Sequence, residues 1–258
     1  MTQEARPLIR FASVDPEARL GLPAGANTTP SATTVVLLTT VVSAAVYGVA
    51  YAMRERDWGG VAWEYMTGFG RIPIPIVILS IWCLAFLAVK ALKIRAQRAA
   101  LAIRFVPADT GFTLSASTAD AVVDAIDRAA DEPLRFMFLA RARAVLRMMR
   151  NLGRVSDVDD VIASRGDVDE GSMDSGYTVV RGFIWAIPVL GFIGTVVGLT
   201  PAMGRFGDAL RSAGKDVDAI TQQLTGVLAG LDTAFITTAE ALIAVIFIQL
   251  FQTAVRRA

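Results

Sequence analysis

Residues 187–199 read Ile187-Pro188-Val189-Leu190-Gly191-Phe192-Ile193-Gly194-Thr195-Val196-Val197-Gly198-Leu199, inside an uncharged run bounded by Arg181 and Arg205. An apolar run of this length predicts a helix that spans a membrane. The quoted stretch carries one proline, three glycines and one threonine where a lipid-facing helix favours leucine and isoleucine. Small residues let neighbouring helices approach closely, and a threonine hydroxyl at this depth can meet an ion. The stretch therefore predicts a membrane helix that faces protein or a pore.

The composition also indicates a membrane protein. Apolar residues make up 54% of the 258 residues and charged residues 19%, and the mean hydropathy is +0.51, outside the usual range of soluble domains. The net charge of +1 argues against general binding to nucleic acid. The chain has no histidine and a single cysteine, Cys83, which excludes an internal disulfide, a histidine-dependent triad and a Cys–His zinc site. We therefore expect no enzymatic activity, no metal and no cofactor.

Four uncharged or nearly uncharged runs are long enough to cross a hydrocarbon core of about 30 Å. These runs are Thr33 to Met53, Ile72 to Val89, Gly182 to Gly204 and Thr233 to Val255. The first run could also be the core of a secretory signal, but it exceeds the roughly 7 to 15 residues usual for one. The sequence thus predicts an all-α integral membrane protein with four transmembrane helices.

The distribution of basic residues predicts the orientation. One cluster directly follows the second run, and a short one ends the chain: Lys90, Lys93, Arg95, Arg98 and Arg104, then Arg256 and Arg257. Basic residues flanking spans stay in the cytoplasm, so we expect both termini there, with a cytoplasmic insert between spans two and three. The predicted organisation is an N-terminal tail (1–32), spans one and two (33–92), a helical insert with an acidic linker (93–178) and the channel-forming spans three and four (179–258).

The parts outside the spans have distinct compositions. Residues 118–152 are rich in helix formers, and Pro133 should kink or split the helix. Residues 156–176 carry seven acidic residues among Gly and Ser and are typical of a mobile linker. The first 32 residues contain scattered prolines and glycines and are interpreted as a disordered or surface-lying tail. Residues 205–231 are amphipathic, and they either lie along the outer surface or extend the fourth span into a longer helix.

The fourth run carries polar groups at helical spacing. Thr233, Thr237 and Glu240 share one face, with Thr238 beside them. If the third span runs outward and the fourth inward, Thr195 and Thr238 lie roughly 13 Å and 8 Å from the outer ends of their spans, with Glu240 at about 10 Å. A layer of this kind predicts an ion path. The alternatives are hydroxyls bonded to backbone carbonyls and a neutral Glu240 carboxyl bonded to a neighbouring threonine.

Both segments resemble a known family. Residues 187–199 resemble the A-P-x-x-G-L-x-G-T-V-x-G segment of the MotA/TolQ/ExbB proton-channel family; the matching residues are Pro188, Gly191, Gly194, Thr195 and Gly198. Leu231 to Leu242 resembles the family's A-L-x-x-T-A pore helix; here the matching residues are Ala234, Phe235, Thr238 and Ala239. Four spans with the large insert after the second resemble the MotA arrangement more than the three-span TolQ and ExbB arrangement.

The resemblance implies a function that the composition does not. It implies a proton-conducting subunit of a stator or motor complex in the bacterial inner (cytoplasmic) membrane, which couples the proton motive force to mechanical work. It also implies a homo-oligomer, a pentamer, around a single-span MotB/TolR/ExbD-like partner whose membrane helix carries a titrating Asp. Thr195 and Thr238 would line the path, and Pro188, Gly191, Gly194 and Gly198 would pack the helices.

Two departures from the family pattern leave alternatives open. The Glu typical of the TolQ/ExbB pore helix falls on Thr233, and the small residue after the T-A pair falls on Glu240. Thr237 and Glu240 could favour sodium over protons. A scaffold that only assembles subunits in the lipid and conducts nothing is the second hypothesis; it predicts that threonine substitutions are harmless, whereas bulky replacements of Gly191 or Gly194 break assembly.

Overall fold

The computed structural model describes residues 8–107, 112–115, 117–152, 156–212 and 217–257. Within these ranges the chain forms helices and no strand apart from an isolated bridge between Ile9 and Ala130. The chain divides into two compact units. We call Val36–Leu87 with Val179–Arg257 the membrane unit, and Met1–Val35 with Ala88–Thr178 the insert unit. Helices α3 and α5 contribute to both.

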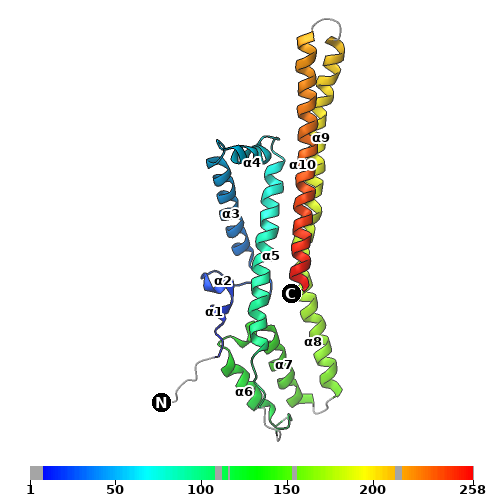
Figure 1. Ribbon diagram of the computed structural model, residues 1–258. Coiled ribbons are helices and arrows are strands. Elements are labelled where there is room, and N and C mark those ends of the chain that lie inside the picture. Colours follow the sequence, from blue (N-terminus) through cyan, green and yellow to red (C-terminus); the bar gives the residue numbers. More distant parts are fainter. Residues whose placement is uncertain (1–7, 108–111, 116, 153–155, 213–216, 258) are drawn as a thin grey trace. The chain divides into compact units, whose positions relative to one another are not determined.

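The membrane unit contains four helices that are long and apolar enough to cross a bilayer. They belong to α3 (Ala32–Ala52), α5 (Pro73–Leu101), α9 (Thr178–Ser212) and α10 (Val217–Arg257), and a shorter helix, α4 (Asp57–Thr67), lies between α3 and α5 (Figure 1). In a hydrocarbon core only helices or closed barrels satisfy the backbone, which is why these apolar runs become helices. The predicted all-α fold with four spans is confirmed.

Helices α9 and α10 are longer than the apolar runs within them. The 41 residues of α10 correspond to about 60 Å, twice the hydrocarbon thickness. Residues 205–231 were expected either to lie along the outer surface or to extend the fourth span. The described part of this segment is helical up to Ser212 in α9 and from Val217 in α10, so it extends the two spans. Helix α9 continues through Pro188 and Pro201; a proline removes one backbone hydrogen bond, which membrane helices tolerate where neighbours resatisfy the freed groups.

The insert unit has its own small core. It is built from α6 (Ala119–Ala129), the short 3-10 helix η1 (Pro133–Arg135), α7 (Met137–Leu152) and the last part of α5. Ile126, Phe136 and Leu139 are fully buried in it, with Ala100 of α5. The helix predicted over 118–152 is split as expected, because η1 begins at Pro133 and separates α6 from α7.

The N-terminal segment was expected to be disordered or to lie on the surface, and in residues 8–31 this was wrong. The short helices α1 (Phe11–Val14) and α2 (Pro16–Arg19) form there, and Phe11 is buried in the insert core. The Phe11 amide donates to Asp131 Oδ1 at 2.7 Å. Specific contacts to residues distant in sequence outweigh a composition that favours disorder.

The acidic stretch was expected to be a mobile linker, and this was also wrong. It forms α8 (Ser156–Ser175). Its acidic residues have helical neighbours to pair with: Arg141 of α7 donates to Asp169 Oδ2 at 2.6 Å. At the end of α8 the Met173 carbonyl accepts a hydrogen bond from Lys90 Nζ, and that ammonium lies 4.2 Å from the ring centre of Tyr177. Basic residues of α5 and α7 thus hold the acidic helix.

Candidate ion pathway

Helices α9 and α10 meet along a line of small residues, which we call the seam. A Cβ added to Gly191 would lie 2.7 Å from Ala241 Cβ, and one added to Gly198 would lie 2.7 Å from the Gly230 carbonyl oxygen. A Cβ at Gly194 would overlap the Thr237 side chain. The backbones therefore approach as closely as glycine allows. Three of the four residues assigned to helix packing face α10 directly; the fourth, Pro188, is half-buried in α9.

The threonines of α10 lie on or beside the seam. The Thr238 hydroxyl is 3.1 Å from the Gly191 carbonyl oxygen across the seam and 3.1 Å from the Ala234 oxygen of its own helix. Thr237 is fully buried, and its hydroxyl donates to the Thr233 carbonyl at 2.9 Å. The Thr233 hydroxyl in turn donates to the Ala229 carbonyl at 3.0 Å. Each hydroxyl donates its proton to a carbonyl, and its lone pairs stay able to accept hydrogen bonds.

Thr195 lies at the level of these threonines. It follows Gly194, whose missing side chain makes room for Thr237. One further residue along a helix is a rise of about 1.5 Å, so Thr195 and Thr237 occupy nearly the same depth of the α9–α10 hairpin. Thr195 itself is half-buried, and its hydroxyl donates to the Phe192 carbonyl at 2.6 Å. The seam thus brings Thr195, Thr237 and Thr238 into one layer.

Glu240 lies outside the seam. Its side chain is within electrostatic reach of Tyr47, on α3. Its Oε2 atom is buried and has no hydrogen-bond partner in the described part of the chain. Helical spacing predicts that Glu240 shares a face of α10 with Thr233 and Thr237. In the structure Thr237 packs on α9, whereas Glu240 interacts with α3. No described hydrogen bond joins Oε2 to a threonine.

The sequence interpretation did not identify two polar residues of α3, one of which, Tyr47, interacts with Glu240. Ser43 and Tyr47 lie one helical turn apart on α3, and Ser43 Oγ and Tyr47 Oη are buried without a partner among the described residues. The sequence did carry a signal for them, because Ser43 and Tyr47 are two hydroxyl side chains four residues apart within an apolar run. Among the described residues no group of three His, Cys, Asp or Glu side chains could hold a metal ion.

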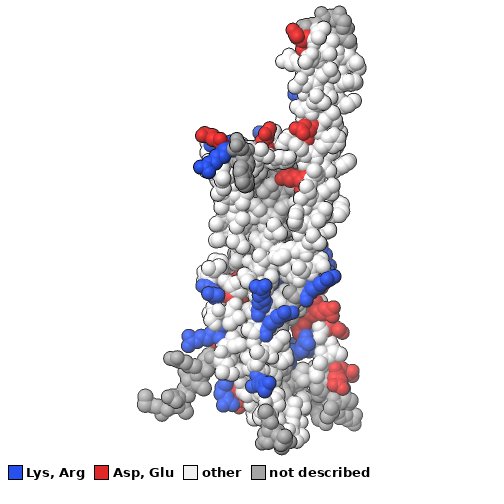
Figure 2. All heavy atoms as spheres, viewed as in Figure 1, with Lys and Arg blue, Asp and Glu red and all other residues white. Residues whose placement is uncertain are grey.

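Large apolar side chains of α9 and α10 point away from the single subunit. In the membrane unit Figure 2 shows mostly uncharged surface between the ends of the long helices. The exposed residues include Trp185, Phe192, Met203, Phe235, Phe247 and Leu250, each at least 64% exposed. Side chains of this kind need lipid or another subunit to cover them.

A hairpin of two membrane helices joined through glycines, with hydroxyls at one depth, defines a helical membrane protein of the channel-forming class. The chain belongs to the MotA/TolQ/ExbB proton channel family, whose model matches residues 129–258. Searches of curated proteins and of solved structures gave no match. The family assignment confirms the resemblance found in the motifs, and the match begins ahead of them, within the insert unit.

Membership in this family establishes the general function of the protein. The protein is a multi-pass membrane subunit of the ion-driven, energy-transducing kind, and proteins of this family work with a partner subunit in a membrane complex. The family is one of channels and transducers, not of enzymes, and a stator driven by the proton motive force fits it.

Proposed function

We propose that this protein conducts protons along the seam between α9 and α10 and couples their flow to mechanical work in a partner subunit. The observation that carries the proposal is the hydrogen bond from Thr238 to the Gly191 carbonyl. It places a hydroxyl where two glycine-lined backbones meet, with Thr195 and Thr237 at the same level. The partner is a single-span MotB/TolR/ExbD-like subunit whose membrane helix carries an Asp.

The physical basis is the behaviour of a carboxyl group beside hydroxyls in a partly hydrated gap. A membrane Asp changes charge as it takes and releases a proton, and oxygen atoms at a fixed depth can hold water beside it. The hydroxyls of Thr195 and Thr238 donate their protons to backbone carbonyls, so their lone pairs are left to accept hydrogen bonds from water or from the protonated Asp carboxyl. One charge crossing 100 mV releases about 2.3 kcal/mol, so a few transfers supply a mechanical step.

We infer a pentamer in the bacterial inner membrane, with both termini cytoplasmic. The exposed apolar faces of α9 and α10 support an oligomer, because copies of the chain can bury them around a partner helix. The Lys and Arg residues that follow the second span and end the chain support the orientation.

The experiment is ion flux in liposomes that contain the chain and its partner, under an imposed pH or sodium gradient. Thr195→Val and Thr238→Val keep side-chain shape and remove a hydroxyl, so we expect at least a tenfold loss of flux with assembly intact. The matched controls are Thr200→Val on α9 and Thr253→Val on α10, exposed threonines that also bond their own helix. Flux that survives in both seam variants would refute the path.

The second candidate function is a non-conducting scaffold. The observation in its favour is that the Thr195, Thr233, Thr237 and Thr238 hydroxyls each donate to a backbone carbonyl, as structural threonines do. It predicts no flux in a fully assembled wild-type complex, and activity retained in the threonine variants. A sodium-driven channel is distinguished in the same assay, because only the sodium gradient would then drive flux.

A further inference from the structure

The membrane unit contains a second group of polar side chains, away from the seam. Ser43 Oγ, Tyr47 Oη and Glu240 Oε2 are all buried and lack hydrogen-bond partners among the residues that the structure describes. A buried polar atom without a partner destabilises the fold, because it has lost its hydrogen bonds to water and gained none. Such groups are rare in proteins and call for an explanation such as a bound water or ion.

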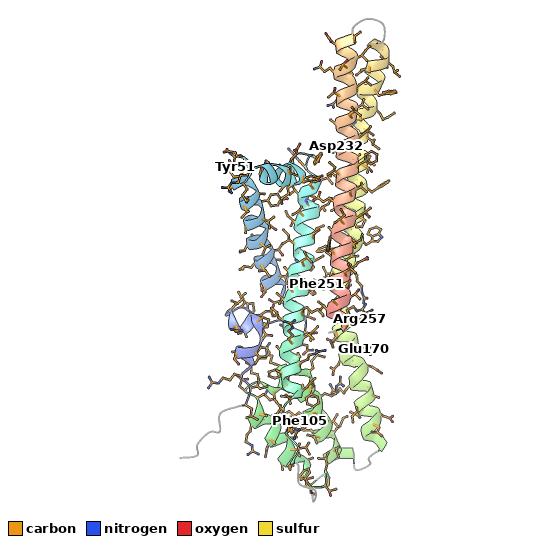
Figure 3. All side chains as sticks on the ribbon, viewed as in Figure 1. Tyr51, Phe105, Glu170, Asp232, Phe251 and Arg257 are labelled. Carbon is orange, nitrogen blue, oxygen red and sulfur yellow. The ribbon has the colours of Figure 1, made fainter. Side chains whose placement is uncertain are left out.

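These three side chains belong to one neighbourhood. Tyr47 interacts electrostatically with Glu240, and Ser43 precedes Tyr47 by one turn, on the same face of α3. Figure 3 shows Tyr51, near the end of α3, level with Asp232 on α10. Counting from Ala52 and Asp232, the depths are about 13 Å for Ser43, 8 Å for Tyr47 and 12 Å for Glu240. Glu240 thus lies between the two hydroxyls in depth.

The surroundings favour a neutral carboxyl. An ionised carboxylate is unfavourable in hydrocarbon unless a positive charge compensates it. Titratable groups nearby are few: α3 contributes Tyr47 and, near its end, Tyr51; the membrane part of α5 contributes Cys83; and α9 has none between Arg181 and Arg205. All three elements lack a basic side chain at this depth. A proton is therefore the simplest compensation for Glu240.

We propose that Glu240, Tyr47 and Ser43 form a proton-binding site inside each subunit, in which bound water links the neutral carboxyl to the two hydroxyls. Tyr and Ser hydroxyls donate and accept, so a water between them and the carboxyl satisfies all three groups. Their side chains offer too few oxygens to replace the hydration shell of a metal cation, which favours the proton over sodium. The site is distinct from the seam, because its other members are on α3.

The site gives the subunit a proton store of its own. Glu240 is two residues from Thr238, so a change in its charge acts next to the seam. Its use in conduction rests on the proposed function, whereas protonation of Glu240 does not.

The test is infrared spectroscopy of the purified full-length chain in lipid, titrated with pH, since neutral and ionised carboxyls absorb at different frequencies. At neutral pH we expect a neutral-carboxyl band that is lost in Glu240→Gln, a replacement of the same shape. The matched control is Asp232→Asn, which removes an exposed carboxyl of the same helix and should leave the band unchanged. Tyr47→Phe and Ser43→Ala should each move the band to higher frequency, because fewer hydrogen bonds reach the carbonyl.

Three results would overturn the proposal. These are a neutral-pH spectrum in which Glu240→Gln removes no band, a band that neither Tyr47→Phe nor Ser43→Ala moves, and a band that sodium chloride abolishes at constant pH. The last result would reassign the site to a sodium ion. The infrared titration is independent of the liposome flux assay, so the two proposals fail separately. A neutral-carboxyl band in a protein that shows no flux would refute conduction alone, and flux in a protein without the band would refute this site alone.

Discussion

Glu17 is a fully buried carboxylate in a segment whose composition is typical of disorder. Its oxygens accept hydrogen bonds from the Gly25 and Ser31 amides at 2.7 Å each and from Lys93 Nζ at 2.6 Å. Asp15 Oδ2 lies 3.5 Å from the same ammonium. Burial alone would raise the pKa of Glu17, but the hydrogen bonds from Lys93, Gly25 and Ser31 outweigh it and hold the pKa below its ordinary value of 4.5. The ion pair ties the N-terminal segment to α5.

A depressed pKa makes this contact depend on pH. A carboxyl whose pKa is lower when folded contributes stability above its unfolded pKa, and this stability is lost as pH falls through the folded value. We therefore expect residues 17–31 to stay protected at neutral pH and to lose protection as the pH drops below 4.5. Hydrogen exchange of the Gly25 and Ser31 amides, corrected for the intrinsic effect of pH, measures this.

Removing the carboxylate charge should have the same effect at neutral pH. Glu17→Gln removes the nearer of the two carboxylates beside the buried Lys93 ammonium and leaves Asp15 at 3.5 Å, so we expect a cost of about 3 kcal/mol, the lower end for a broken buried pair. Exchange in residues 17–31 should accelerate more than a hundredfold. The control is Glu132→Gln, which breaks an exposed pair with Arg135 and should cost less than about 1 kcal/mol. Equal effects of the two substitutions would contradict a special role for the buried pair.

At the scale of elements, the α9–α10 seam is set by glycine. A Cβ at Gly198 would lie 2.7 Å from the Gly230 oxygen and 2.9 Å from the Ala234 nitrogen, both backbone atoms that cannot move independently. Gly198→Ala should therefore destabilise the hairpin by about 1–3 kcal/mol, although alanine is the better helix former. The matched control is Gly204→Ala on the same helix, where nothing lies within 4 Å of an added Cβ.

Thermal unfolding in detergent, followed by circular dichroism, compares the two variants. We expect a lower melting temperature for Gly198→Ala and an unchanged or slightly higher one for Gly204→Ala. If both variants melt like the wild type, the two helices do not approach each other as closely as the structure has them.

The spans could be predicted from sequence because the bilayer imposes a length on any apolar run. The seam glycines, Thr195 and Thr238 could be predicted because each belongs to a short motif within one segment of the sequence. The burial of the N-terminal segment could not be predicted this way. It depends on the pair of Glu17 with Lys93, which are 76 positions apart in the sequence. Ser43 and Tyr47 were missed for the same reason: hydropathy marks a span but says nothing of which other span it faces.

At the scale of the molecule, the distribution of basic residues predicts which segments lie on which side of the membrane. Helix α5 is continuous from Pro73 to Leu101, and its basic residues all lie in the second half. The apolar run of α9 ends at Arg205, well before the helix ends at Ser212. By the positive-inside rule we therefore expect residues 93–178 in the cytoplasm, and we expect α4 and the connection between α9 and α10 on the outer side.

Cysteine labelling checks this arrangement, because Cys83 is the single native cysteine and is buried. In a Cys83→Ser background, a membrane-impermeant maleimide added outside intact cells should modify Glu64→Cys and Asp208→Cys. Arg98→Cys and Asp159→Cys should react only in inverted vesicles, since the positive-inside rule retains the basic cluster around Arg98 in the cytoplasm. All four side chains are exposed, so access to them depends on the side of the membrane. Labelling of Asp208→Cys and Arg98→Cys from the same side would contradict an α9 that runs outward.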